Sequence, residues 1–276
     1  MNQYAANPAI EDTVSVIPAL ACPPGGFLAG VFDGHSGKDA SSWCAEELLP
    51  YLQYYRWSSR TNQVIDKSAF LEADHHFLEL SLRDQRIQAG LSGACLTVAH
   101  VSGSNVRVGN AGDCRTIIGR RVPKSVQPKS NAESNDPAIP PPPAAYKYQA
   151  VELTTDHQID TNHLERERLL RDHPDESDII QKDRVKGRLQ PTRGFGDGFY
   201  KRKEFYNARR LSKPYATWTP PYTTVEPDIT EYQLQHEDEF MVMATDGLFQ
   251  DLNSQQGKER GITAYKLEGN MFHSDE

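Results

Sequence analysis

Apolar residues in this chain fall into short runs whose spacing differs from one segment to the next. Gly26–Phe32 (GFLAGVF) is apolar at every position, which predicts a short strand buried on both faces. The pair Asp33-Gly34 follows this run, and we expect it to close the strand with a turn. In Lys38–Tyr55, and again in Ser68–Leu82, apolar residues recur near helical spacing. This spacing predicts two amphipathic helices that lie against a sheet.

The rest of the chain is richer in strand patterns. Two alternating apolar runs, Ala94–Val101 and Val106–Asn110, are separated by four turn-forming residues and predict a hairpin. A charged helix is expected at Thr161–Arg171. Further strands are expected at residues 13–17, 115–119, 148–153, 223–234 and 239–245. Strands joined by hairpin turns, with few helices between them, favour an α+β layered sandwich over a parallel βαβ fold.

Composition and charge narrow the class of protein. The chain is 37% apolar and too rich in Phe, Tyr, Leu and Val to be disordered, yet no apolar run approaches the roughly 20 residues of a membrane span. The net charge of −8 argues against a general role in nucleic-acid binding. The four cysteines lie far apart without a CxxC pair, a pattern that fits a reducing compartment rather than a zinc site. No targeting signal is visible.

Acidic residues recur beside glycine at the ends of expected strands. Asp33, Asp113 and Asp246 each stand next to a glycine there, and Glu11-Asp12 precedes the strand at 13–17. Each Asp-Gly pair alone is typical of a turn. Together, however, carboxylates at neighbouring strand ends would repel one another unless cations neutralised them. Oxygen ligands select hard ions, so the expected cofactor is Mg²⁺ or Mn²⁺.

One histidine stands beside this acidic group. His35 follows Asp33-Gly34 directly and, next to bound cations, becomes a candidate general acid because its pKa lies in the working range. An isolated histidine of this kind is otherwise more often structural or merely exposed. Arg193–Gly198 (RGFGDG) is not a dinucleotide fingerprint, and Ser36 does not stand in a GxSxG elbow.

Five motifs in a fixed order resemble those of the metal-dependent serine/threonine protein phosphatases of the PPM, or type-2C, family. They are VFDGHSG (31–37), GNAGDCR (109–115), LTTDH (153–157), TRGFGD (192–197) and ATDGLFQ (244–250). The resemblance implies a four-layer α-β-β-α sandwich of two antiparallel sheets flanked by helices. It also implies a protein serine/threonine phosphatase that needs Mg²⁺ or Mn²⁺, in the form of two ions with a weaker third.

The resemblance assigns a role to each candidate residue. It implies that Asp33 bridges two metals, that the carbonyl of Gly34 ligates one of them, and that Asp246 ligates the other. Glu11 and Asp12 would hold metal-bound waters. It further implies that His35 protonates the leaving Ser/Thr oxygen, that Asp113 lies near the third metal, and that a metal-activated water attacks phosphorus in line.

A narrower resemblance points to the pyruvate dehydrogenase phosphatase branch. NPAIED (7–12), the segment 156–197 and the segment 219–230 follow the pattern of that branch. Most of the wider family has a phosphate-holding arginine where this chain has Asn7, so the metals are expected to hold the phosphate. The branch implies a mitochondrial matrix location; without this resemblance the expected location is cytoplasmic. It also implies a phosphorylated protein partner such as pyruvate dehydrogenase.

The expected domain spans residues 1–256, with an exposed Pro-rich insertion at 121–147, and is followed by a divergent tail at 257–276. Gln250 stands where the family has Asp or Glu, and the tail lacks the family's last Asp ligand. The chain is therefore expected to lack a C-terminal part of the domain. The alternatives are a pseudophosphatase that binds phosphoproteins and a calcium-binding or structural domain. The retained acidic residues and His35 favour the enzyme, whereas the tail favours the pseudophosphatase.

Overall fold

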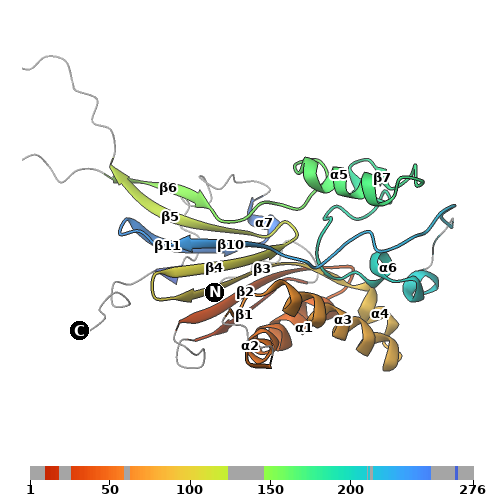
Figure 1. Ribbon diagram of the computed structural model, residues 1–276, viewed down its shortest axis with the longest axis horizontal. Helices are drawn as coiled ribbons and strands as arrows, with labels where there is room; N and C mark the ends of the chain where they lie inside the picture. The colour runs from red at the N-terminus through yellow and green to blue at the C-terminus, as the bar shows by residue number, and fades with distance from the viewer. Residues whose placement is uncertain are drawn as a thin grey trace, which may run out of the picture.

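Two antiparallel β-sheets form the centre of the molecule (Figure 1). The computed structural model describes residues 10–18, 26–58, 63–123, 146–209, 211 and 214–249, together with the backbone of 265–266. The first sheet follows the order β1-β2-β3-β4-β10, with β9 paired to β3. Its strands are β1 (Thr13–Ile17), β2 (Phe27–His35), β3 (Gly93–Ser102), β4 (Asn105–Ala111), β9 (Phe195–Gly196) and β10 (Asp228–Gln233).

The second sheet has the order β12-β11-β5-β6. Its strands are β5 (Arg115–Pro123), β6 (Tyr146–Glu152), β11 (Asp238–Ala244) and β12 (Tyr265–Lys266). A separate two-stranded ribbon consists of β7 (Ile180–Gln181) and β8 (Arg184–Val185). Every paired strand among these is antiparallel, so the predicted class of sheet is confirmed.

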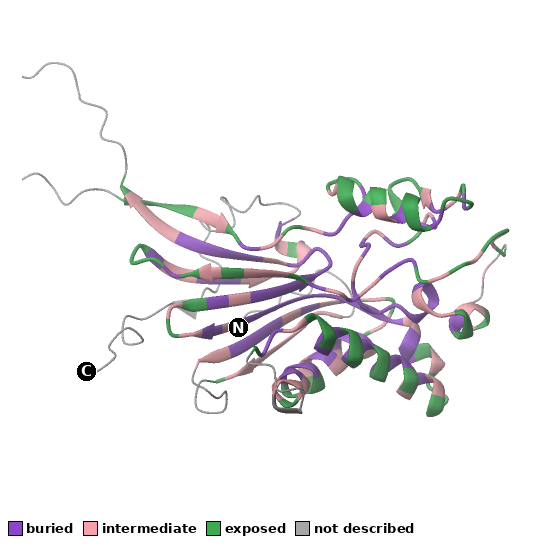
Figure 2. Ribbon diagram, viewed as in Figure 1, coloured by how far each residue is buried: buried purple, intermediate pink, exposed green. Residues whose placement is uncertain are grey.

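The two sheets pack face to face through the alternate side chains of their strands. Val101 and Val108 of the first sheet share a buried cluster with Ile118 and Met241 of the second. Thr97 and Thr116, both fully buried, join the sheets through a hydroxyl–hydroxyl hydrogen bond of 2.8 Å. Side chains one residue away along β3 face the other side of the first sheet, so this strand is buried on both faces. Figure 2 shows the buried residues concentrated along these central strands.

Helices cover the outer face of the first sheet (Figure 1). The segment predicted to be helical over 38–55 consists of α1 (Asp39–Trp43), a π-helical turn (Cys44–Leu48) and α2 (Leu49–Ser58). The second predicted helix is α3 (Lys67–Arg83), whose first turn is capped by the Asp66 carboxylate, and the short α4 (Ile87–Leu91) follows it. Apolar side chains of these helices share a core with Leu28, Phe32, Leu96 and Val98 of the first sheet, so both helix predictions are confirmed.

The remaining short elements lie beyond the ends of the strands and on the second sheet. They are α5 (His163–Asp172), α6 (Gly198–Lys201), a 3₁₀ helix (Lys203–Ala208) and α7 (Asp246–Phe249). Phe249 of α7 packs on Ile117 and Val242 at the outer face of the second sheet. Phe199 and Tyr200 of α6 belong to a third cluster with Val185 and Tyr222.

Two predicted boundaries are wrong, whereas the strand predicted at 239–245 ends before Asp246, as expected, and a helical turn follows it. The pair Asp33-Gly34 does not close its strand, because β2 continues through His35 opposite Gly93 of β3. The strand predicted from residue 223 begins only at Asp228, because Pro227 has no amide to donate and Thr224 instead accepts a hydrogen bond from the Gly194 amide.

Several predictions concern residues that the structure describes only partly or not at all. The strands flanking the insertion extend to Pro123 and from Tyr146, and residues 124–145 lie outside the described part. Asn7, Gln250 and the tail predictions also lie outside it. Cys44, Cys95 and Cys114 are buried and free. Within the described ranges, no helix combines the length and hydropathy needed to cross a bilayer.

Candidate active site

The N-terminal acidic pair lies beside the end of β2. Thr13 pairs with Phe32, so Glu11 and Asp12 come alongside the residues that follow Phe32 in β2. At Gly34 an added Cβ would stand 2.4 Å from the carbonyl oxygen of Glu11, so only glycine allows this approach. Ser41 donates from its hydroxyl to the same carbonyl oxygen at 2.5 Å. The sequence thus brings the backbones of Glu11 and Gly34 together, as predicted for a shared site.

Both carboxylates of this pair are held by hydrogen bonds. The Glu11 carboxylate accepts from the backbone amide of Gly37 at 2.9 Å. The Asp12 carboxylate accepts from the hydroxyl of Thr245 at 3.0 Å, which lies between β11 and α7. The pair therefore connects the first sheet to the end of the second, where Asp246 is found.

Asp33 is surrounded by negative charge. Burial raises its pKa most, and the carboxylates of Asp12, Asp246 and Asp113 raise it further, to about 8; a hydrogen bond with Asp246 adds to this effect. Four predicted acidic residues, from separate elements of the two sheets, are therefore close enough to repel one another. This is the electrostatic arrangement that a bound cation would relieve.

Asp113 is buried in the loop between β4 and β5. Its carboxylate accepts a hydrogen bond of 2.6 Å from the side-chain amide of Gln158. The preceding Gly112 has φ +114, and an added Cβ would stand 2.4 Å from the Cβ of Cys95. The glycine therefore lets the loop turn closely over β3 and carry Asp113 toward Asp33.

His35 pairs with an acid that the sequence analysis did not select. Its Nε2 lies 3.0 Å and 3.1 Å from the two carboxylate oxygens of Asp197. Burial alone would lower the pKa of His35, but the charge and hydrogen bond of Asp197, with the charges of Asp33 and Asp113, raise it. The carboxylate of Asp197 therefore favours the protonated form of the imidazole, which is the form that can donate a proton.

Asp197 owes its position to an unusual backbone conformation. It lies in the left-handed region at φ +55, directly after β9, and its amide donates to the carbonyl of Ser92 at 2.8 Å. The only signal in the sequence was the single acid in the TRGFGD motif. Its pairing with His35 could not be seen there, because 162 positions separate the two residues.

One pocket of about 260 Å³ collects most of the predicted residues and adds basic ones. We call Asp33, Asp113 and Asp246 its acidic lining, and Arg184, Arg188 and Arg209 its arginine lining. His35 and Tyr200 also line it. Glu11, Asp12 and Gly34 are not among its lining residues, although the charge of Asp12 acts on Asp33.

The oxygen donors of the acidic lining can be compared with what metal ions require. No three His, Cys, Asp or Glu side chains of the described ranges are gathered as a preformed metal site. The chemistry of the donors nevertheless suits hard divalent ions, because the acidic lining offers only oxygen atoms. The mutual repulsion that raises the pKa of Asp33 is also what cation binding would remove. The residues present therefore fit Mg²⁺ or Mn²⁺.

Comparison with known proteins places the chain among phosphatases. The family described as "Protein phosphatase 2C" matches residues 10–259. The rice (Oryza sativa subsp. japonica) "Probable protein phosphatase 2C 61" is 31% identical over 94% of this chain and 68% of its own length. A second rice relative, "Probable protein phosphatase 2C 78", is 30% identical over 90% of this chain and 59% of its own length.

A human relative and two solved structures extend this comparison. The human mitochondrial "[Pyruvate dehydrogenase [acetyl-transferring]]-phosphatase 2" is 27% identical over 99% of this chain and 62% of its own length. It stands beside plant relatives of similar identity, so the predicted closeness to its branch in particular is not supported. The serine-threonine phosphatase 2C of Toxoplasma gondii superposes with a TM-score of 0.62 at 19% identity, over 92% of this chain and 78% of its own. A Caenorhabditis elegans sex-determining protein superposes with a TM-score of 0.62 at 16% identity, over 92% of this chain and 52% of its own. Both structures share the fold of this chain.

Proposed function

Because the chain belongs to the protein phosphatase 2C family, we propose that it is a metal-dependent phosphatase that hydrolyses phosphoserine and phosphothreonine in proteins. The observation that carries this proposal is the joining of the acidic lining and His35 in one pocket. A phosphatase without a phosphoenzyme needs cations at the phosphate and a proton donor at the leaving oxygen. The pocket has candidates for both tasks.

The acidic residues would hold the cations. In this proposal Asp33, the Gly34 carbonyl and Asp246 would hold Mg²⁺ or Mn²⁺ directly, and Glu11 and Asp12 would act through water. Asp113 would serve a third, weaker ion, and Gln158 orients its carboxylate by donating to it. Bound cations would activate a water for attack and offset the negative charge of the phosphoryl group.

His35 would act at the leaving group. Its protonated imidazole donates a proton to the serine or threonine oxygen as the bond to phosphorus breaks, because an alkoxide is a poor leaving group. Asp197, whose side chain is almost fully buried, would orient the ring, and its charge favours the protonated imidazole. His35 is then the catalytic acid and Asp197 its positioning residue.

The alternatives are less well supported. The curated relatives described above are named as phosphatases, which gives no support to a pseudophosphatase. A calcium-binding or purely structural domain would not need the His35–Asp197 pair beside the acidic lining.

A finer proposal concerns the substrate and the compartment. The human relative named as a mitochondrial pyruvate dehydrogenase phosphatase aligns over 99% of this chain. On that basis we propose phosphorylated pyruvate dehydrogenase as a substrate and the mitochondrial matrix as the location. Comparing turnover of phosphorylated pyruvate dehydrogenase with that of an unrelated phosphoprotein tests the first part. Equal specificity constants for the two would contradict it.

The activity itself is tested with a phosphothreonine peptide. We expect turnover in Mn²⁺ or Mg²⁺, none in excess EDTA, and loss of turnover in Asp33→Asn. The matched control is Asp84→Asn, which changes an exposed acid at the end of α3 that pairs with Arg83 and lies outside the pocket. Turnover that survives EDTA, or an Asp33→Asn variant as active as Asp84→Asn, would overturn the proposal.

A further inference from the structure

The pocket combines a negative lining with a positive one, and the proposed chemistry uses only the first. We propose that the arginine lining, together with the hydroxyl of Tyr200, binds the phosphoryl group of the substrate. This inference rests on the proposed phosphatase function and adds the residues that would recognise the phosphate. Three observations support it: arginines without a carboxylate partner among the described residues, a buried hydroxyl without a hydrogen-bond partner there, and a fixed local backbone.

The arginine lining differs from the other arginines in its ion pairs. Arg188 and Arg209 have no carboxylate partner among the described residues, and Arg184 donates only to the carbonyl of Arg188 and the side chain of Gln190. Nearly all other described arginines pair with an acid, namely residues 83, 86, 107, 115, 120, 121, 166, 168, 171, 193 and 202. Among the described residues, the arginine lining therefore has guanidinium groups whose charge no carboxylate of the chain neutralises.

Tyr200 supplies the observation that points most directly to a ligand. The residue is 1% exposed, and its buried hydroxyl has no hydrogen-bond partner within the described part of the chain. Burial of an unpaired hydroxyl costs free energy, roughly 1–3 kcal/mol. Tyr200 lines the pocket, and the Arg209 guanidinium lies 5.5 Å from its ring centroid. A phosphate oxygen would accept from this hydroxyl and pair with Arg209.

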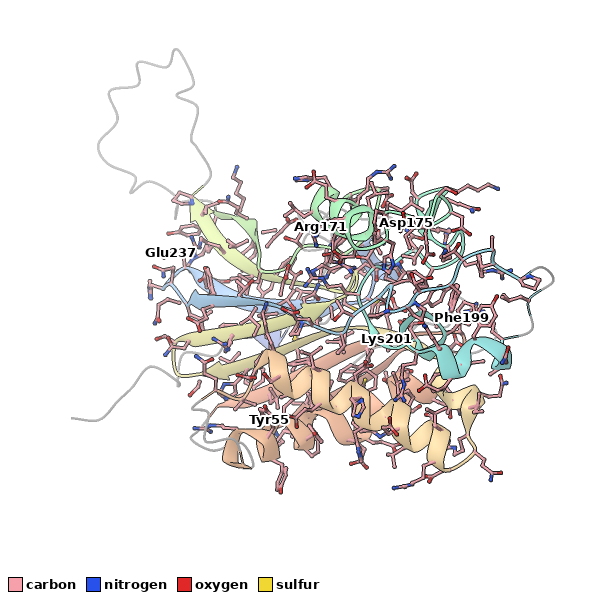
Figure 3. The ribbon with its side chains drawn as sticks, turned by 45° about the vertical axis from the view of Figure 1, so that its right-hand side comes forward. Tyr55, Arg171, Asp175, Phe199, Lys201 and Glu237 are labelled. Carbon is pink, nitrogen blue, oxygen red and sulfur yellow. The ribbon has the colours of Figure 1, made fainter. Side chains whose placement is uncertain are left out.

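The backbone that carries these residues is fixed by local contacts. Lys182 and Asp183 both have positive φ and form the two-residue turn between β7 and β8, which places Arg184 at the start of β8. The fully buried ammonium group of Lys186 pairs with Glu176 and Asp178 just beyond it. Arg209 lies over the ring of Phe199, 5.0 Å from its centroid; Figure 3 labels Phe199 on α6. The arginine lining is therefore presented in advance of binding.

The acidic lining gives a reason for a second source of positive charge. A phosphate dianion would be repelled by the carboxylates of Asp33, Asp113 and Asp246 wherever cations do not screen them. Arginines hold phosphate in paired hydrogen bonds, so the arginine lining would offset this repulsion.

The test measures phosphate binding directly. Inorganic phosphate is titrated calorimetrically into the Mg²⁺-loaded protein, and KM is measured for a phosphothreonine peptide with neutral flanking residues. Arg188→Gln, Arg209→Gln and Tyr200→Phe are each expected to weaken both by roughly 10-fold, since each removes a hydrogen bond to a charged group. Arg171→Gln, which changes an exposed arginine of α5 paired with Asp172, should change neither.

Tyr200→Phe separates binding from folding. It removes a hydroxyl that has no partner in the structure, so Tm should stay unchanged or rise while phosphate binding weakens. Unchanged phosphate affinity in Arg188→Gln and Arg209→Gln would overturn the inference. So would an effect confined to peptides with acidic flanking residues, because the arginines would then contact a neighbouring substrate residue. If wild-type protein binds phosphate through these residues but hydrolyses no phosphopeptide, the proposed function fails and the binding site stands.

Discussion

The two linings of the pocket are built in different ways. Asp33 lies in β2, and Asp246 begins α7 two residues after the end of β11. Both strands are held in register by pairing with a neighbouring strand, β2 with β3 and β11 with β5. The arginine lining comes from the two-residue strand β8 and from irregular segments after it. The acidic lining is therefore positioned by the central sheets. The arginine lining lies in a region with little regular structure, so other interactions must hold its backbone in place.

Buried ion pairs fix that region. Glu165 of α5 accepts from Arg168, Arg193 and Thr192. Glu176 is held in the same way by Lys186, Thr219 and Tyr222. Such pairs are strongly destabilising when one partner is removed, because the other is left as a buried charge. Removing one charge from these buried ion pairs should therefore disturb the arginine lining. The acidic lining should respond mainly to substitutions of its own residues.

The largest effect is expected at His35. His35→Gln should slow phosphopeptide turnover by roughly 10²–10⁴-fold, since the leaving alkoxide then lacks its proton donor. Turnover of an aryl phosphate, whose leaving group needs little protonation, should fall much less. His75→Gln, at an exposed site on α3, is the control. An equal loss on both substrates would mean that His35 has another role.

A large loss of stability is expected at Lys186. Lys186→Met removes the partner of buried Glu176 and should lower the free energy of unfolding by roughly 3–5 kcal/mol. Phosphate binding should weaken as well, because Arg184 and Arg188 lose their anchor. The control Lys67→Met breaks an exposed pair with Glu226 and should cost about 0–1 kcal/mol. Similar denaturation midpoints for the two variants would contradict this account of the region.

The two linings should also differ in their response to acid. Burial opposes ionisation of Glu165, but its bonds to Arg193, Arg168 and Thr192 lower its pKa from 4.5 to about 2. The unfolded chain therefore binds this proton more readily, and the stability contributed is complete above about pH 4.5 and is lost as pH falls toward 2.

Hydrogen exchange measured between pH 5 and 3 tests this difference. Amides of α5 and of residues 176–193 should lose protection before those of β3 and β5. In Glu165→Gln, protection should be low already at pH 5 and change less with pH. Loss of protection in both regions at the same pH would contradict the view that ion pairs stabilise one region and strand pairing the other.

The smallest effect is expected between the sheets. Thr97→Val leaves the buried Thr116 hydroxyl without its partner and should cost about 1–3 kcal/mol, whereas the double variant Thr97→Val/Thr116→Val should be nearly neutral. Activity should persist in both. Thermal melts of the single and double variants measure this difference in stability. If the double variant loses still more stability than Thr97→Val, the unpaired hydroxyl does not explain the cost of the single substitution.

The sequence was most informative about candidate residues that lie in or beside long strands. Strand patterns and Asp-Gly pairs located Asp33, Asp113 and Asp246, because strand ends bring such residues to one edge. The exact end of β2 was missed, since Asp-Gly favours turns locally while pairing with β3 extends the strand. Tertiary pairing thus overrode a local preference.

Residues on irregular segments could not be found in this way. Asp197 reaches His35 through its left-handed backbone. Arg184 comes to the pocket from the two-residue strand β8, and Arg188 and Arg209 come from segments outside the strands. Nothing in the spacing of these arginines distinguishes them from surface arginines. What marks them in the structure is that no acidic partner is found for them among the described residues, and this is a property of the fold.

We propose that the acidic lining binds cations and that the arginine lining binds phosphate, and one measurement tests this division most directly. Mn²⁺ is titrated calorimetrically into wild-type protein, Asp33→Asn and Arg188→Gln, with no phosphate present. We predict that Asp33→Asn loses most of its Mn²⁺ affinity and that Arg188→Gln keeps the wild-type value. Equal Mn²⁺ binding by wild-type protein and Asp33→Asn would contradict the account.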